Sequence, residues 1–167
     1  MKVDTKQKDT GSSSLMDGAI IPKYDLRFEL LGTLDELNSH LGLIRATILY
    51  AKQKIYVKTI QSLIITVSAY IADNHSHKYL INDNDVTLLK DETDELRKLC
   101  PEINSLIIPG ENELAARIDI ARTVARRAER FLSQVHENYP VSNIILRFIN
   151  CLSDYLFVMA RYIEHSD

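Results

Sequence analysis

The sequence of 167 residues contains only two cysteines, Cys100 and Cys151, which lie far apart and form no CxxC pair. Such a small number argues against a zinc ribbon and against a disulfide framework, and it suits a reducing compartment. An excess of charge of one sign is also missing, since the net charge is −3 and both signs are interspersed. No overall field would therefore attract nucleic acid or an anionic membrane, and an anionic ligand would need a local basic cluster.

Long apolar runs are missing as well. The longest nearly uncharged apolar stretch, residues 63–72, is about half of the ~20 residues that a membrane span needs. The polar beginning, MKVDTKQKDTGSSS, lacks the apolar core of a secretory signal. With 46% hydrophobic and 26% charged residues, the chain has the composition of a globular protein, and we expect one cytoplasmic domain spanning residues 1–167.

Helical periodicity dominates the chain after residue 24. Apolar residues step by three and four in a first helix that reaches about residue 50: Leu30, Leu34, Leu37, Leu41 and Ile44. Further helices are predicted over about 52–73, 85–100, 113–135 and 141–164. No alternating strand pattern or internal repeat is evident. Helices joined by short loops pack as an up-and-down bundle, so the predicted fold is all-α, with four or five helices and no sheet.

Residues 1–24 are the only long irregular segment expected, with Gly11, Gly18 and Pro22 as breakers. The segment is either a flexible terminus or a loop whose lysines, hydroxyls and backbone N–H groups fold over phosphates. It lacks the GxxxxGK[ST] spacing, so it is not a P-loop.

An arginine stripe is the most unusual feature of the helix at 113–135. Arg122, Arg126 and Arg130 are spaced i, i+4 and i+8, with Glu129 beside them, whereas Arg127 points elsewhere. The stripe is either a solvated face with local ion pairs, such as Asp119 with Arg122, or an anion clamp, because guanidinium groups match phosphate oxygens two bonds at a time.

Two further segments carry polar residues with two possible roles. Asp35, in GTLDELN, either favours the first turn of its helix or reaches an arginine on another helix. Asn150 shares a helical stripe with Asp154, Phe157 and Arg161. Its amide needs partners, which are either a buried hydrogen bond or a nucleotide or metal-bound water.

These motifs, in this order, resemble the PduO-type corrinoid adenosyltransferases. The matching stretches are TKQKDTGSS (5–13), PK (22–23), GTLDELN (32–38), LIIPG (106–110), ARTVARRAER (121–130) and INCLSDYLF (149–157). The resemblance implies a five-helix bundle of the ferritin/cobalamin adenosyltransferase-like type, assembled as a homotrimer with ATP between subunits. It also implies transfer of the 5′-deoxyadenosyl group of ATP to the cobalt of cob(I)alamin, which gives adenosylcobalamin and tripolyphosphate.

The resemblance assigns roles only to matching residues. The N-terminal segment 1–24 would wrap the triphosphate and become ordered when MgATP binds, since it offers little apolar burial of its own; its ligands would be Thr5, Lys6, Lys8, Asp9, Gly11, Ser13 and Lys23. On the helices, the nucleotide would be held by Arg126 as γ-phosphate ligand, Arg127, Glu129, Arg130 and Asn150.

The remaining assignments concern the metal, the corrinoid and the ion pair. Mg²⁺ would be bound through the ATP phosphates and not by an all-protein site, with Asn150 helping to place it. Arg122 would pair with Asp35 and shape the site and the subunit contact. Leu106 would lie on the corrinoid side, and a corrinoid reductase is a possible partner.

Four residues depart from the family pattern, and a fifth, Cys151, replaces an arginine. Lys8 and Glu111 replace glycines, Leu106 replaces an aromatic residue and Asp119 replaces a histidine. These departures keep open a non-catalytic, nucleotide-binding relative that has lost corrinoid adenosylation. A ferritin-like di-metal bundle is disfavoured, because none of the five histidines has a glutamate three residues before it.

Overall fold

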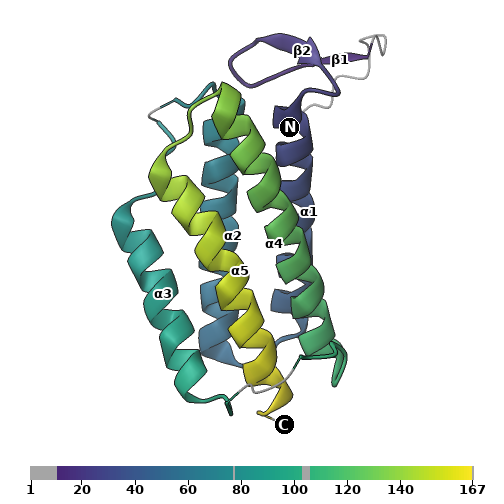
Figure 1. Ribbon diagram of the computed structural model, residues 1–167, viewed down its shortest axis with the longest axis vertical. Coiled ribbons are helices and arrows are strands. Elements are labelled where there is room, and N and C mark those ends of the chain that lie inside the picture. Colours follow the sequence, from purple (N-terminus) through teal and green to yellow (C-terminus); the bar gives the residue numbers. More distant parts are fainter. Residues whose placement is uncertain (1–10, 77, 103–105, 167) are drawn as a thin grey trace.

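The computed structural model describes residues 11–76, 78–102 and 106–166. Within these ranges the chain forms five helices and one small sheet (Figure 1). The helices are α1 (Leu26–Thr47), α2 (Ala51–Ala72), α3 (Asp83–Lys98), α4 (Glu113–Asn138) and α5 (Asn143–Glu164). Successive helices run in opposite directions, which confirms the predicted up-and-down five-helix bundle.

The packing order of the helices differs from their order in the chain. α1 packs on α2 and α4, α4 packs on α5, and α5 packs on α3. α4 and α5 therefore lie side by side in the middle of the bundle (Figure 1). The motifs at 121–130 and 149–157, which lie on these two helices, consequently face a shared interface.

The helical core is formed by the residues whose spacing predicted it. The five apolar residues of the first stripe are all fully buried on one face of α1. α5 has apolar residues on more than one side and is the most buried helix, with Phe148, Leu152, Tyr155, Leu156 and Met159 at 0% exposure. α2 and α5 are long and apolar enough to span a membrane by length and composition, a test that core helices of soluble proteins also pass.

The ends of the helices follow local capping chemistry. Asp25 caps α1 by accepting a hydrogen bond from the N–H of Arg27 at 2.9 Å. Asn82 and Asp85 form a reciprocal capping box, so α3 begins at Asp83 and not at residue 85. Ile48 has an extended backbone, so α1 ends at Thr47, three residues before the predicted end.

The prediction that the chain contains no sheet is wrong for the N-terminal segment. β1 (Ser12–Ser14) pairs antiparallel with β2 (Ile20–Pro22), and Gly18, with φ at 86°, lies in the connection between them. Strands of three residues are too short to give a recognisable alternation. The hairpin is attached to the bundle by buried Leu15 and by the N–H of Met16, which donates to the carbonyl oxygen of Ala72 at 2.9 Å.

Candidate functional site

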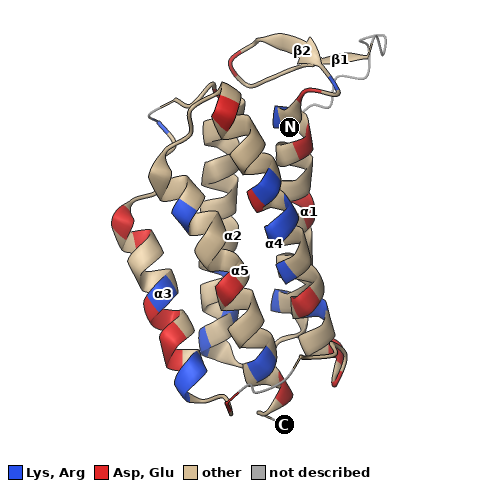
Figure 2. Ribbon diagram, in the orientation of Figure 1, with Lys and Arg blue, Asp and Glu red and all other residues tan. Residues whose placement is uncertain are grey.

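The arginine stripe lies on α4 beside α5 and α1 (Figure 2). Arg126 and Arg130 are exposed, and Arg130 donates through Nη1 to the carbonyl oxygen of Arg126 at 3.1 Å. Across the part of the chain that the structure describes, Arg126 has no ion pair. Its guanidinium group is therefore available to an anion, which favours the clamp over a face neutralised by local pairs.

The Asn150 amide joins α5 to this stripe. Its Nδ2 donates to Oε1 of Glu129 at 2.8 Å, and the Asn150 side chain is exposed. The alternative of a buried hydrogen bond is thus wrong, because the partner is another predicted site residue at the surface. The contact holds the carboxamide next to the arginines, where it can meet a phosphate or a metal-bound water.

Arg127 points away from the stripe toward α1, as its helical position predicts, and forms an ion pair with Glu36. This pair borders a hollow of about 380 Å³ that is also lined by Lys23, Gly32, Thr33 and Phe131. The structure therefore brings the predicted residues Lys23 and Arg127 to one cavity, although they are more than 100 positions apart in the chain.

The N-terminal hairpin gathers three of the predicted phosphate ligands. Ser13 pairs with Ile21 in the sheet, and the N–H of Lys23 donates to the carbonyl oxygen of Gly11 at 2.9 Å. Gly11 has a φ of 74°, a conformation that favours glycine. The other predicted ligands of this segment lie outside the described residues: Thr5, Lys6, Lys8 and Asp9.

Within one chain, Arg122 pairs with Asp119 and not with Asp35. Its Nε donates to Oδ1 of Asp119 at 3.2 Å, which is the local pair that the i, i+3 spacing suggested. Asp35 is exposed and forms no ion pair with any residue of the described ranges. A pair between Arg122 and Asp35 across a subunit contact stays a prediction.

A second hollow, of about 430 Å³, lies between the end of α3 and α5. Its lining includes Phe157, Val158, Cys100 and Pro101, together with Arg97, Glu102 and Arg161. Burial raises the pKa of the Cys100 thiol, so the thiol is neutral at physiological pH. Leu106, the predicted corrinoid-side residue, lies in the next part of the α3–α4 connection and is 99% exposed.

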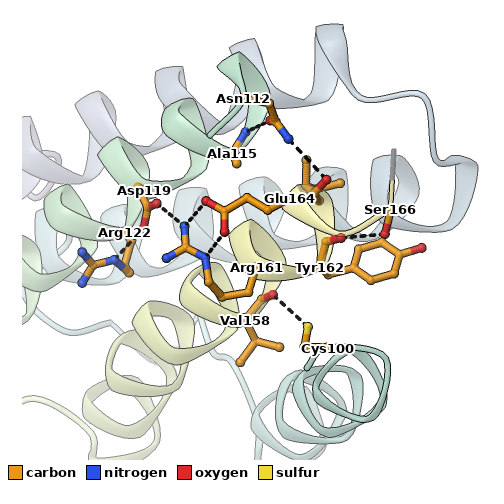
Figure 3. Close-up of polar contacts among 11 residues, drawn as sticks. Cys100, Asn112, Ala115, Asp119, Arg122, Val158, Arg161, Tyr162, Glu164 and Ser166 are labelled. Atoms are coloured by element: carbon orange, nitrogen blue, oxygen red, sulfur yellow. Dashed lines mark hydrogen bonds and ion pairs between the residues drawn. The ribbon is translucent and has the colours of Figure 1, made fainter. Parts of the chain in front are cut away.

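Four charged residues, one of which is the lining residue Arg161, form a largely buried network beside this hollow (Figure 3). Arg161, 3% exposed, donates through Nη2 to Oδ2 of Asp119 at 2.5 Å and to Oε1 of Glu164 at 2.8 Å. Asp119, 4% exposed, binds Arg122 through its other oxygen. Two carboxylates and two guanidinium groups thus compensate each other, which is the condition for burying charge.

Sequence reasoning did not assign Arg161 or Phe157 to the site. Both share a helical stripe with Asn150, but this spacing alone does not distinguish Arg161 from a polar residue at the surface. Its role depends on Asp119 and Glu164, and only the packing of α4 on α5 brings Asp119 to it.

The described residues contain no group of three or more His, Cys, Asp or Glu side chains that could hold a metal ion. A metal bound through the phosphates of ATP stays a prediction. Mg²⁺ is commonly bound in this way, through one or two protein oxygens, waters and substrate phosphates.

Together, these features define a helical bundle with a candidate anion site on α4, at an arginine that has no ion pair among the described residues, and a hollow between α3 and α5 lined by both apolar and charged side chains. The chain belongs to the cobalamin adenosyltransferase family, whose model matches residues 3–163. It is 33% identical over 169 residues to the corrinoid adenosyltransferase of Bacillus subtilis, an alignment that covers 98% of this chain and 87% of that protein.

Longer relatives and solved structures agree with this assignment. The corrinoid adenosyltransferase PduO of Salmonella typhimurium is 33% identical over 171 residues, which are 100% of this chain and 51% of the relative. The chain thus spans about half the length of such PduO relatives. A variant of a PduO-type ATP:corrinoid adenosyltransferase from Lactobacillus reuteri, complexed with cobalamin and ATP, superposes with a TM-score of 0.90 at 30% identity, covering 98% of this chain and 94% of that chain.

Proposed function

We propose that this protein transfers the 5′-deoxyadenosyl group of ATP to the cobalt of cob(I)alamin, giving adenosylcobalamin and tripolyphosphate. The observation that carries the proposal is the Arg126 guanidinium on α4, which has no ion pair among the described residues and is exposed to an anionic ligand. A further L. reuteri variant, complexed with ATP, has a TM-score of 0.88 and 31% identity to this chain, covering 98% of this chain and 94% of that chain.

The chemistry of the reaction matches the residue types at the site. Co(I) supplies an electron pair to C5′ of the ribose, the C5′–O bond breaks, and the leaving tripolyphosphate takes the bonding electrons. The developing charge is therefore on the leaving group, where the arginines would stabilise it and a phosphate-bound Mg²⁺ would supply further positive charge. A general base is not required, because no proton has to be removed from the cobalt nucleophile.

We assign the roles as follows. Arg126 binds the γ-phosphate, Arg130 and the Glu129–Asn150 pair border the triphosphate and its Mg²⁺, and the hairpin with Lys23 closes over the phosphates. The hollow beside Phe157 takes the corrin ring, whose apolar face suits Phe157 and Val158. The exposed Leu106 would approach the corrin from the α3–α4 connection.

We further propose a homotrimer whose subunit contact completes the site. Two observations support it: Asp35 has no ion pair among the residues that the structure describes, and Arg126 and Arg130 of the stripe are exposed on a single chain. In a trimer, Asp35 of one subunit would reach Arg122 of the next. A reductase supplying Co(I) is the further partner that this chemistry requires.

The test is an anaerobic assay with purified protein, MgATP and chemically reduced cob(I)alamin. Conversion is followed by the corrin absorbance spectrum, and tripolyphosphate release is measured in parallel. Equal amounts of adenosylcobalamin and tripolyphosphate are expected. ATP binding without either product would instead identify a non-catalytic relative. Whether the protein is a trimer is measured separately, by analytical sedimentation of the same sample.

A further inference from the structure

The Asp119 carboxylate bridges two arginines that come from different helices. Its Oδ1 accepts from Nε of Arg122 at 3.2 Å, within α4, and its Oδ2 accepts from Nη2 of Arg161 at 2.5 Å, across to α5 (Figure 3). Each oxygen therefore serves a different guanidinium group. Because Asp119 and Arg161 are both buried, water cannot replace the contact between them without opening the interface of α4 and α5.

Both arginines meet at the same aromatic ring. The guanidinium carbon of Arg161 lies 5.5 Å from the centroid of Phe157, and that of Arg122 lies 5.9 Å from it. These distances are within the range of a cation–π contact. Phe157 and Arg161 line the larger hollow, whereas Asp119 does not. Asp119 can thus affect this wall only through the arginines.

Glu164 limits the freedom of Arg161 further. Its Oε2 lies 2.7 Å from Nε of Arg161, and its Oε1 accepts from Nη2 at 2.8 Å. Arg161 is consequently held by two carboxylates, but Arg122 is held by Asp119 alone among the described residues. Within one chain, removing the Asp119 charge would leave the two guanidinium groups with Glu164 as their one carboxylate, so they would repel and separate.

We propose that Asp119 is a positioning residue: it fixes Arg122 and Arg161 against Phe157 and thereby sets the shape and charge of the wall on which the corrinoid rests. This inference rests on the proposed function for the identity of the ligand in the hollow. Arg126 and Arg130, the proposed triphosphate ligands, form no ion pair with Asp119, so we expect binding of MgATP to depend little on this carboxylate.

The test is Asp119→Asn, which keeps the size of the side chain and removes its charge. We expect the KM for cob(I)alamin to rise about tenfold, a change in binding free energy of ~1.4 kcal/mol, with the KM for MgATP within about twofold of the wild type. Asp119→Glu restores the charge and should recover part of the loss. Glu113→Gln, which removes an exposed ion pair with Arg117 on the same helix, is the matched control and should change neither KM.

If Asp119 only stabilised the fold, its substitution would not change the KM for cob(I)alamin selectively. Equal increases in both KM values, or an unchanged corrinoid KM in folded Asp119→Asn protein, would overturn the proposal. If this variant does not fold, Glu164→Gln gives the answer, because it loosens Arg161 while Asp119 stays charged. A rise of about threefold in the KM for cob(I)alamin, without a rise in the KM for MgATP, supports the proposal. If the KM for cob(I)alamin does not rise selectively, the proposal is overturned.

Failure of the proposed function is recognised separately. If the wild type binds cob(II)alamin but forms no adenosylcobalamin, the proposed function fails. The Asp119 variants are then compared by their Kd for cob(II)alamin, measured in an absorbance titration, instead of by the KM for cob(I)alamin. A weaker Kd for Asp119→Asn then supports the positioning role, and equal Kd values refute it. A wild type that binds no corrinoid refutes both.

Discussion

Arg126→Ala separates a phosphate-binding arginine from a structural one. The side chain is exposed and has no ion pair within the described ranges, so its removal leaves no buried charge and opens no cavity. A surface change of this kind alters the free energy of unfolding by at most about 0.5 kcal/mol. The loss of one positioned donor to a developing charge, in contrast, lowers kcat by about 10²- to 10³-fold.

The assay combines steady-state kinetics with a urea denaturation curve of the same preparation. Arg117→Ala is the matched control, because it removes an arginine from the same helix that is engaged with Glu113 outside the stripe. We expect the control to retain kcat within about twofold. The assignment of Arg126 to phosphate binding would be refuted if Arg126→Ala turned over close to the wild-type rate. It would also be refuted if turnover fell only in proportion to a large loss in the free energy of unfolding.

Three further predictions follow from the packing and the titrating groups. Phe148→Ala should lower the free energy of unfolding by about 3–5 kcal/mol in urea melts, because the ring is fully buried and leaves a cavity; a loss below about 1 kcal/mol would contradict the packing. Asp25→Ala should cost about 1 kcal/mol at neutral pH through loss of the α1 cap. The hydrogen bond from Arg27 lowers the pKa of Asp25 in the folded state, so the wild type should have the higher free energy of unfolding above the ordinary carboxyl pKa. This difference from Asp25→Ala should narrow as pH falls below about 3.9. A difference in the free energy of unfolding that stays constant down to acid pH would refute this linkage. Bound cobalamin should slow the alkylation of Cys100, which lines the larger hollow, but not that of Cys151, which lies outside it. Alkylation is measured by mass spectrometry of protein treated with iodoacetamide. Equal protection of both thiols would place the corrinoid elsewhere.

Much of the fold could be predicted because helices of about 20 residues repeat their apolar spacing many times. The α1 stripe from Leu30 to Ile44 is a clear case, since five residues on one face all reached the core. The hairpin could not be found in this way. Its strands have three residues each, and its position depends on a main-chain contact with Ala72, which no side-chain pattern records.

The site was predictable where neighbours on one helix define the geometry. The spacing of Asp119 and Arg122 gave their ion pair, and the direction of Arg127 away from the stripe followed from its helical position. Contacts between helices were harder. The bond between Asn150 and Glu129, and the capture of Arg161 by Asp119, depend on the rotation of α5 against α4, which the sequence alone does not specify.

The attachment of the hairpin through backbone atoms makes its position tolerant of amino-acid substitutions. The N–H groups of Met16 and Asp17 donate to the carbonyl oxygen of Ala72, and Lys23 donates from its own N–H to Gly11. Main-chain donors are unchanged by nearly every substitution, proline excepted. The exposed side chains of this segment, unlike that of buried Leu15, can thus be exchanged while the segment keeps its position over the end of the bundle. A terminus anchored in this manner can acquire new ligand contacts by single substitutions, which makes it the part of the molecule where specificity is most easily selected.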